Sequence, residues 1–157
     1  MSNCFILLAA GKGKRFKSKS LKQFINYKNK PLFMHSVDRA IKSNLFKEIV
    51  IVTNNKIQLR NKKIKIIKGG KERYKSSQKA LEFIKNKKFK NVFIHDAARP
   101  NFSIHLLKNL KKYLNKNKAV VPYINTVDSA KYMNRNKIVN LKRENVLFTQ
   151  TPQCFDF

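Results

Sequence analysis

The stretch that decides the fold is Phe5-Ile6-Leu7-Leu8-Ala9-Ala10-Gly11-Lys12-Gly13-Lys14-Arg15. It opens with a continuous apolar run, which is typical of a strand covered on both faces. The run ends in small residues and then in cations. Small residues let an anion approach backbone N–H groups, and cations attract it. The stretch predicts a strand that leads into a phosphate-binding loop. A tight strand exit with solvated lysines is the alternative interpretation.

This loop differs from two common phosphate-binding motifs. No Lys-Ser or Lys-Thr pair follows a second glycine, as a P-loop requires. Phe16 stands where G-x-G-x-x-G needs its third glycine. Arg15 and Lys22 are the candidate groups for neutralising negative charge that develops at a phosphorus centre.

Short apolar runs alternate with helical patterns along the chain. Helices are expected after Pro31, around Ala80–Ile84, and from the predicted N-cap Ser103 to Leu114. Strands are expected at Cys4–Ala9, Glu48–Thr53, Lys63–Lys68, Asn91–His95 and Ala119–Tyr123. This alternation predicts an α/β fold: a Rossmann-like, mostly parallel sheet with helices on both faces. The length of 157 residues favours one domain, residues 1–157.

The pattern changes near the C-terminus, at approximately residues 125–148. Ser129–Met133, Lys137–Leu141 and Asn145–Thr149 resemble short strands joined by polar turns, with no helix between them. Such a segment predicts a β-arm or hairpin that extends from the core.

Three unusual loops are expected at one edge of the sheet. They are Gly11–Arg15 after the first strand, Gly69-Gly70 after the third, and Asp96-Ala97-Ala98-Arg99-Pro100 after the fourth. In open α/β sheets, ligands bind beyond the carboxyl ends of the strands. The sequence therefore predicts a ligand site built from small residues, cations and one carboxylate.

The later motifs can be interpreted as parts of a ligand site or as ordinary structural features. Gly69-Gly70-Lys71-Glu72-Arg73, followed by Ser76, suits an anion at a helix N-terminus, and its alternative is a helix-capping turn. Asp96 suits Mg²⁺, which takes a carboxylate or two together with substrate phosphates. His95 is expected to pack or cap locally. Ser129, Lys131 and Arg143 suit a small phosphorylated substrate, and a surface hairpin with ordinary charges is the alternative.

Composition narrows the class of protein. The formal net charge is +28, with only 8 acidic residues. Such a charge attracts polyanions, which leaves a basic nucleic-acid-binding module open. The lysines are spread over nearly every segment, however, which favours solvated faces over a specific nucleic-acid groove. Apolar runs are too short to span a bilayer, and the 2 cysteines do not form a disulfide framework. A reduced, cytoplasmic protein without a signal peptide is expected.

Taken together, the motifs resemble those of the 2-C-methyl-D-erythritol 4-phosphate cytidylyltransferase family, in order and over essentially the whole chain. The resemblance rests on Leu8-Ala9-Ala10-Gly11-x-Gly13-x-Arg15 with Lys22-Gln23, Gly69-Gly70-x-x-Arg73-x-x-Ser76, His95-Asp96-Ala97-Ala98-Arg99-Pro100, Asp128-Ser129-Ala130-Lys131, and Arg143 with Gln150-Thr151-Pro152-Gln153. It implies transfer of CMP from CTP to 2-C-methyl-D-erythritol 4-phosphate, with Mg²⁺ and release of pyrophosphate, in isoprenoid precursor synthesis.

The resemblance also implies residue roles. Arg15, Lys22 and Arg143 are the implied catalytic residues, and Asp96 is the implied metal ligand. The implied nucleotide contacts are Leu8, Ala9, Ala10, Gly11, Gly13, Gly70, Lys71 and Ser76. The implied contacts to the acceptor substrate are Asp96, Ala97, Arg99, Ser129 and Arg143.

The family is a homodimer built through the arm, so a second copy of the chain is the implied partner. The family pattern also continues beyond the position of Phe157, which implies that the nucleotide half is represented more fully than the acceptor half. A sister enzyme acting on ribitol 5-phosphate or another sugar-alcohol phosphate is the main alternative. The nucleic-acid module is the other.

Overall fold

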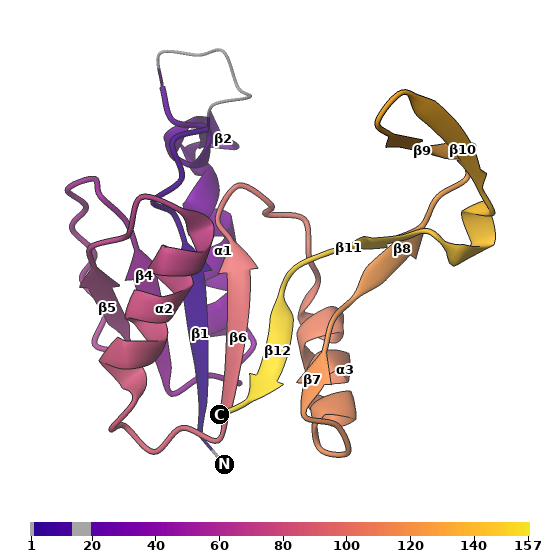
Figure 1. The fold of residues 1–157 in the computed structure, drawn as a ribbon. Coiled ribbons are helices and arrows are strands. Elements are labelled where there is room, and N and C mark those ends of the chain that lie inside the picture. The colour runs from indigo at the N-terminus through magenta and orange to yellow at the C-terminus, as the bar shows by residue number, and fades with distance from the viewer. Residues whose placement is uncertain (1, 14–19) are drawn as a thin grey trace.

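The computed structural model describes residues 2–13 and 20–157. Its main sheet has six strands in the order β5-β4-β1-β6-β12-β7 (Figure 1). Their bounds are β1 Asn3–Leu8, β4 Glu48–Val52, β5 Ile64–Ile67, β6 Asn91–Asp96, β7 Ala119–Val120 and β12 Gln153–Asp156. β1 pairs in parallel with β4 and β6, and β4 pairs in parallel with β5. β12 runs antiparallel to β6 and β7. The predicted mostly parallel sheet is confirmed.

Helices cover both faces of this sheet, as predicted. They are α1 Leu32–Lys42, α2 Arg73–Ile84 and α3 Ile104–Leu114. Because side chains alternate along a strand, Phe5 and Leu7 of β1 join the core with α1 and α3, whereas Cys4 and Ile6 join the core with α2. All four side chains are fully buried. Burying both faces explains why β1 reads as a continuous apolar run.

The helix starts agree closely with the sequence signals. The Ser103 hydroxyl oxygen accepts a hydrogen bond from the Leu106 N–H at 3.0 Å, which makes Ser103 the N-cap of α3 as predicted. α1 begins one residue after Pro31, which itself occupies the N-cap position.

Two expectations about strands were wrong in detail, and one strand was missed. The predicted strand Ala119–Tyr123 is divided into β7 and β8 (Tyr123–Asn125), and Pro122, which has no N–H to give to a ladder, lies between them. β12 was not predicted as a strand, because a proline precedes a run of only four residues. β5 lies at the edge of the sheet, where Ile66 is exposed rather than covered on both faces.

The arm consists of two small antiparallel sheets. β8 pairs with β11 (Leu147–Thr149), and β9 (Ala130–Asn134) pairs with β10 (Lys137–Leu141). Figure 1 shows both pairs projecting away from the main sheet. A short 3-10 helix, η2 (Arg143–Asn145), stands where no helix was expected. Near the N-terminus, η1 (Lys22–Phe24) and the small hairpin of β2 (Asn26–Tyr27) and β3 (Lys30–Pro31) were also not predicted.

The two cysteines are structural. Cys4 and Cys154 are free thiols and both are fully buried. Burial raises the pKa of the Cys4 thiol to about 12, so this side chain stays protonated and unreactive at neutral pH. Within residues 2–13 and 20–157, no helix has both the length and the apolar character needed to cross a bilayer.

Candidate functional site

The register of the central strands gathers three loops at one edge of the sheet. Leu8, the last residue of β1, lies beside Val52 of β4 and Asp96 of β6. The Ala9 N–H then donates to the Val52 carbonyl at 2.8 Å, and the Ala97 N–H donates to the Leu8 carbonyl at 3.0 Å. These bonds carry the strand pairing into the loops, which places the Ala9–Gly13 segment between the loops that follow β4 and β6.

Gly69 allows the loop after β5 to touch the loop after β1. A Cβ atom at Gly69 would lie 2.2 Å from the Ala10 Cβ and 3.2 Å from the Ser76 hydroxyl oxygen. Real Cβ atoms do not approach each other so closely, so the two loops meet only because residue 69 has no side chain.

The turn before α2 is held by Ser76. Its hydroxyl oxygen accepts a hydrogen bond from the Gly70 N–H at 3.0 Å, and its own N–H donates to the Glu72 carbonyl at 3.0 Å. The Ser76 side chain is buried, whereas the adjacent Lys71 is exposed. The turn therefore presents the start of α2 and a cation at the same edge of the sheet.

Gln23 fixes the loop after β1 from the other side. Its side-chain amide nitrogen donates to the carbonyl oxygens of Ala9 at 2.9 Å and Gly11 at 2.8 Å. Only 4 % of Gln23 is exposed. A buried amide that binds two carbonyls on either side of Ala10 restrains the part of the loop that carries the predicted nucleotide contacts.

Asp96 lies between two arginines at the end of β6. The Arg73 Nε donates to Asp96 Oδ1 at 2.9 Å, and the Arg99 Nε lies 3.6 Å from Oδ2. The Asp96 side chain is 29 % exposed, so a ligand can reach its carboxylate. Among the described residues, no group of three or more His, Cys, Asp or Glu side chains could hold a metal ion. Asp96 therefore belongs to no such cluster, and its nearest charged partners are the two arginines.

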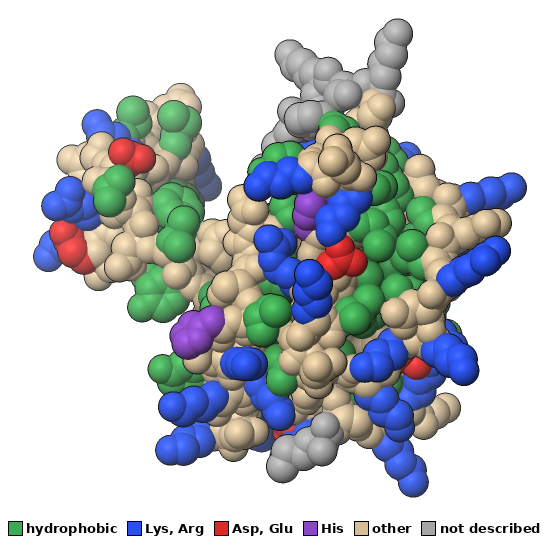
Figure 2. Space-filling view, turned by 180° about the vertical axis from the view of Figure 1, so that it is seen from behind, with side chains coloured by type: hydrophobic (Ala, Val, Ile, Leu, Met, Phe, Trp, Pro, Cys, Tyr) green, Lys and Arg blue, Asp and Glu red, His purple; other side chains and the backbone are tan. Residues whose placement is uncertain are grey.

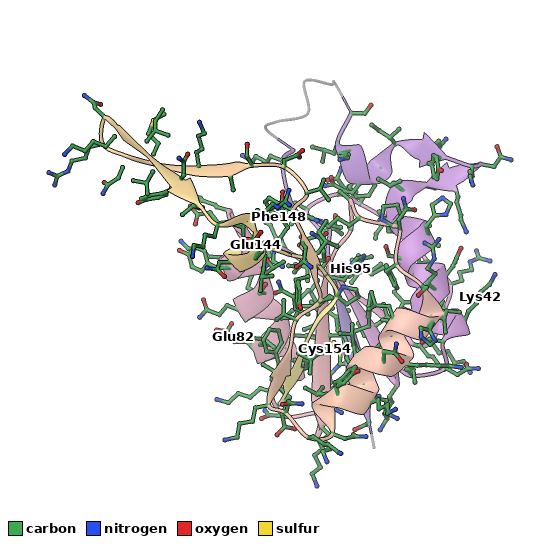
Figure 3. All side chains as sticks on the ribbon, turned by 90° about the vertical axis from the view of Figure 1, so that its right-hand side faces the viewer. Lys42, Glu82, His95, Glu144, Phe148 and Cys154 are labelled. Atoms are coloured by element: carbon green, nitrogen blue, oxygen red, sulfur yellow. The ribbon has the colours of Figure 1, made fainter. Side chains whose placement is uncertain are left out.

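His95 belongs to the interior, as the sequence indicated. It lies inside the body of the protein (Figure 3) and packs on the Phe102 ring at a centroid distance of 4.5 Å. Its Nδ1 is 2.8 Å from the Thr151 hydroxyl oxygen, which also accepts from the Asp96 N–H at 3.4 Å. Burial lowers the pKa of His95 to about 4, so the ring is neutral at physiological pH. Thr151 thus joins β12 to the end of β6.

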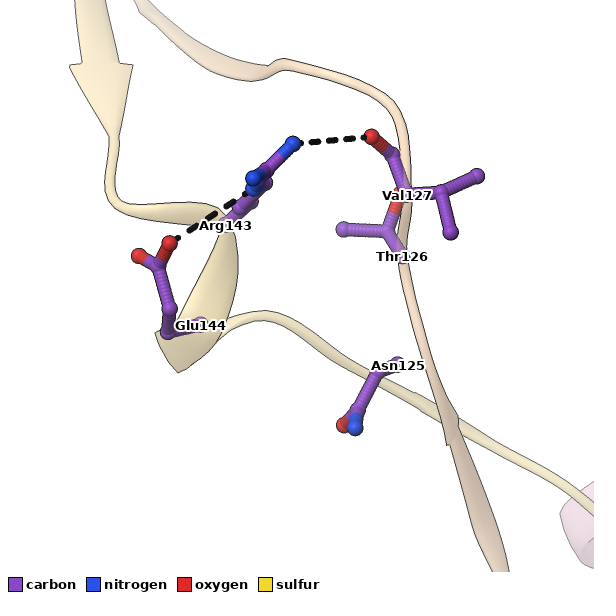
Figure 4. Close-up of a pocket in the computed structure, with 5 residues that line it drawn as sticks. All are labelled: Asn125, Thr126, Val127, Arg143 and Glu144. Atoms are coloured by element: carbon purple, nitrogen blue, oxygen red, sulfur yellow. Dashed lines mark hydrogen bonds and ion pairs between the residues drawn. The ribbon is translucent and has the colours of Figure 1, made fainter.

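The predicted site residues of the arm are not brought to Asp96. Arg143 contacts the Val127 carbonyl and the Glu144 carboxylate, both within the arm, and these residues line a hollow of about 420 Å³ (Figure 4). Ser129 is exposed just before β9. Figure 1 shows the arm leading away from the loops of its own main sheet.

The remaining predicted residues divide between the loop and η1. Gly11 is exposed, and Gly13 has a φ of 58°, in the left-handed region that glycine tolerates. Lys22 begins η1 and is exposed beside the loop. Arg15 lies outside the described residues.

Basic side chains are not confined to this edge. Figure 2 shows Lys and Arg spread over the face that it draws, with no continuous stripe. A single binding groove for nucleic acid would gather them in one track. This distribution agrees with the interpretation of most lysines as solvated side chains.

Three residues of the site had no predicted role: Gln23, Arg73 and Thr151. Each stood inside a quoted motif, but its partners lie far away in the sequence. For Arg73 the available signal was rarity, because arginine is scarce in a chain in which most cations are lysine. Gln23 and Thr151 carried no comparable signal.

The contact between Gly69 and Ala10 gives a matched pair of substitutions. We expect Gly69→Ala to lower the free energy of unfolding by about 1–3 kcal/mol, the usual cost of overpacking. Gly11→Ala should have little effect on stability, because no atom of the described residues, apart from Gly11 itself and its two chain neighbours, lies within 4 Å of a Cβ at that position. Urea denaturation of both variants checks this, and equal stabilities would contradict the close loop packing.

Comparison with known proteins agrees with this geometry. The 2-C-methyl-D-erythritol 4-phosphate cytidylyltransferase (IspD) family matches residues 3–157. The chain is 49% identical to the bifunctional IspD/IspF enzyme of Pelagibacter ubique, over 100% of this chain and 44% of that protein. It is 36% identical to the cytidylyltransferase of Clostridium botulinum strain Loch Maree, over 99% of this chain and 72% of that protein.

A solved structure gives the same result. The bifunctional IspDF from Campylobacter jejuni superposes with a TM-score of 0.86 at 31% identity, over 99% of this chain and 41% of that one. The chain thus spans less than half of its bifunctional relatives. The resemblance drawn from the motifs is confirmed, and the chain belongs to the 2-C-methyl-D-erythritol 4-phosphate cytidylyltransferase family.

Proposed function

We propose that this chain transfers CMP from CTP to 2-C-methyl-D-erythritol 4-phosphate, a step of isoprenoid precursor synthesis. A phosphate oxygen of the acceptor attacks the α-phosphorus of CTP in line. The new P–O bond forms as the bond between the α-phosphorus and the bridging oxygen breaks, and pyrophosphate leaves with that oxygen. Such a reaction needs positioning and charge neutralisation more than acid–base chemistry.

The observation that carries this proposal is the convergence of three loops around Asp96. Two loops with small residues approach each other at Gly69 and Ala10, and the third supplies the carboxylate. Cations line the same edge: Lys22, Lys71, Arg73 and Arg99. A triphosphate would find backbone N–H groups, positive charge and the Asp96 carboxylate at this edge, and the family match implies that the nucleotide is CTP.

In the proposed complex, the loop after β1 and the turn before α2 hold the nucleotide. The contacts are Leu8, Ala9, Ala10, Gly11, Gly13, Gly70, Lys71 and Ser76. Lys22 and Arg15 neutralise the charge that develops at the α-phosphorus. Because Gln23 fixes the carbonyls of Ala9 and Gly11, this part of the loop needs little reorganisation when the nucleotide binds.

Mg²⁺ is the proposed cofactor, and Asp96 is its proposed ligand. Mg²⁺ in nucleotide sites is held by one or two carboxylates, substrate phosphates and water. One accessible carboxylate fits that donor set when the triphosphate supplies the other oxygens. The ion would neutralise charge on the triphosphate, and the side chain of Arg99 would share that role.

For the acceptor, we propose Ala97 and Arg99 at the edge of the sheet together with Ser129 and Arg143 of a partner chain. The arm carries apolar side chains on both faces: Met133 pairs with Ile138, and Tyr132 pairs with Val139, and all four are exposed. A solvent-exposed two-stranded hairpin is marginally stable alone. A homodimer would cover these side chains and bring each arm to the other subunit's site.

The charge distribution and the cysteines bear on two further expectations, the absence of a specific nucleic-acid partner and the cytoplasmic location. The dispersed lysines support no specific nucleic-acid partner. Two buried free thiols suit a reducing compartment, so we place the protein in the cytoplasm.

Pyrophosphate release tests the reaction. With CTP, Mg²⁺ and 2-C-methyl-D-erythritol 4-phosphate, we expect turnover that Asp96→Asn lowers on the order of 100-fold. Asp156→Asn is the matched control, because Asp156 is exposed at the end of β12 and should leave turnover unchanged. Turnover with ribitol 5-phosphate alone would assign the chain to the sister activity. No turnover with either acceptor would refute the proposal.

Sedimentation velocity tests the dimer. We expect a dimer at micromolar concentration, and we expect Ile138→Asp to shift it to monomer, since a charge at this exposed apolar position would be buried at the interface. Lys137→Asp, on the same strand, serves as the control for added negative charge. A monomeric unmodified chain would rule out the arm-mediated dimer.

A further inference from the structure

The Asp96 carboxylate forms an ion pair with the guanidinium group of Arg73. Arg73 is the first residue of α2, and Asp96 is the last residue of β6. The Arg73 Nε donates to Oδ1 at 2.9 Å, which is a charge-assisted hydrogen bond. The Arg99 Nε lies 3.6 Å from Oδ2, an ion pair without a hydrogen bond at that atom. Arg73 is therefore the closer partner of the carboxylate.

The two arginines differ in how firmly they are held. Arg99 is three residues from Asp96, and its Nη1 donates to the Gln150 Oε1 at 2.8 Å, which ties it to the segment before β12. The Arg73 guanidinium, among the described contacts, binds Asp96 alone, and its side chain is 51 % exposed. Arg73 can leave the carboxylate by rotating into solvent, whereas Arg99 has a second attachment.

Arg73 also stands next to the nucleotide turn. It lies two residues after Lys71, with Glu72 between them, and it precedes Ser76, whose hydroxyl oxygen accepts from the Gly70 N–H. Anything that binds at this turn acts beside the Arg73 backbone. A divalent cation that binds a carboxylate oxygen must also share that oxygen with, or take it from, the guanidinium, because two positive groups at one oxygen repel each other.

We propose that Arg73 is a positioning residue that controls access of the divalent cation to Asp96. It holds the carboxylate before the nucleotide arrives and gives it up when the nucleotide-bound cation enters. This inference rests on the proposed use of CTP and Mg²⁺. In this role Arg73 opposes metal binding, so the cation gains Asp96 only together with the nucleotide.

The consequence is a coupling that can be measured without turnover. The Kd for CTP is determined by calorimetry, without acceptor, once with EDTA and once with saturating Mg²⁺. The ratio of the Kd with EDTA to the Kd with Mg²⁺ reports how strongly the metal favours nucleotide binding. Chelation of Mg²⁺ by free CTP contributes equally to every variant, so it cancels when the ratios are compared.

We expect Arg73→Gln to raise this ratio about fivefold, the upper range for a partly exposed ion pair. Arg73→Lys keeps the positive charge and should stay near the unmodified chain. Arg60→Gln removes an arginine from the exposed segment between β4 and β5 and should leave the ratio unchanged.

Other outcomes distinguish a failure of this inference from a failure of the proposed function. If Arg73→Gln weakens CTP binding equally with and without Mg²⁺, the residue has only a structural or nucleotide-binding role, and the inference is overturned. An unchanged ratio overturns it as well. If the unmodified chain binds no CTP under either condition, the proposed function fails first. Circular dichroism of each variant confirms that the fold is intact, as the exposure of Arg73 leads us to expect.

Discussion

The whole site depends on the register of β1 between its two parallel neighbours. Leu8 lies beside Val52 on one side and Asp96 on the other, so the loops that follow these strands begin at the same level. A shift of one residue in either pairing would turn the apolar side chains of β1 toward the wrong core. The burial of Phe5 and Leu7 on one face and of Cys4 and Ile6 on the other therefore also fixes the position of the carboxylate. The register of β1 is therefore required both for the packing of the core and for the geometry of the site.

From this register, each loop is shaped by a local contact. Gly69 makes room for Ala10, Ser76 holds Gly70, and Gln23 holds the carbonyls of Ala9 and Gly11. Thr151 joins the end of β6 to β12 through a buried, neutral His95. The result is an edge in which the Asp96 carboxylate lies among several cations. An excess of positive charge suits a substrate that brings its own negative charge, and the close contact of Gly69 with Ala10 leaves the loop backbone at this edge open to such a substrate.

Much of this arrangement could be predicted from sequence because its signals are local. Continuous apolar runs marked β1, β4 and β6, and helical spacing with the Ser103 cap marked α3. The glycine pairs and Asp96 marked the ligand edge. The remainder depends on contacts between distant residues. β12 is short and follows a proline, and it becomes a strand only because β6 and β7 offer free edges. The partners of Gln23 and Arg73 lie 12 to 23 residues away, where spacing alone gives no indication.

The account's central claim is that the edge formed by the loops after β1, β5 and β6 binds the nucleotide. The most direct test is titration of the isotopically labelled chain with CTP and Mg²⁺, followed by amide chemical shifts. The predicted result is a set of changes centred on Ala9–Gly13, Gly69–Ser76 and Asp96–Arg99, with the lysine-rich face of α3 unaffected. Shift changes spread over the lysines of α3, or no changes at the three loops, would contradict the claim.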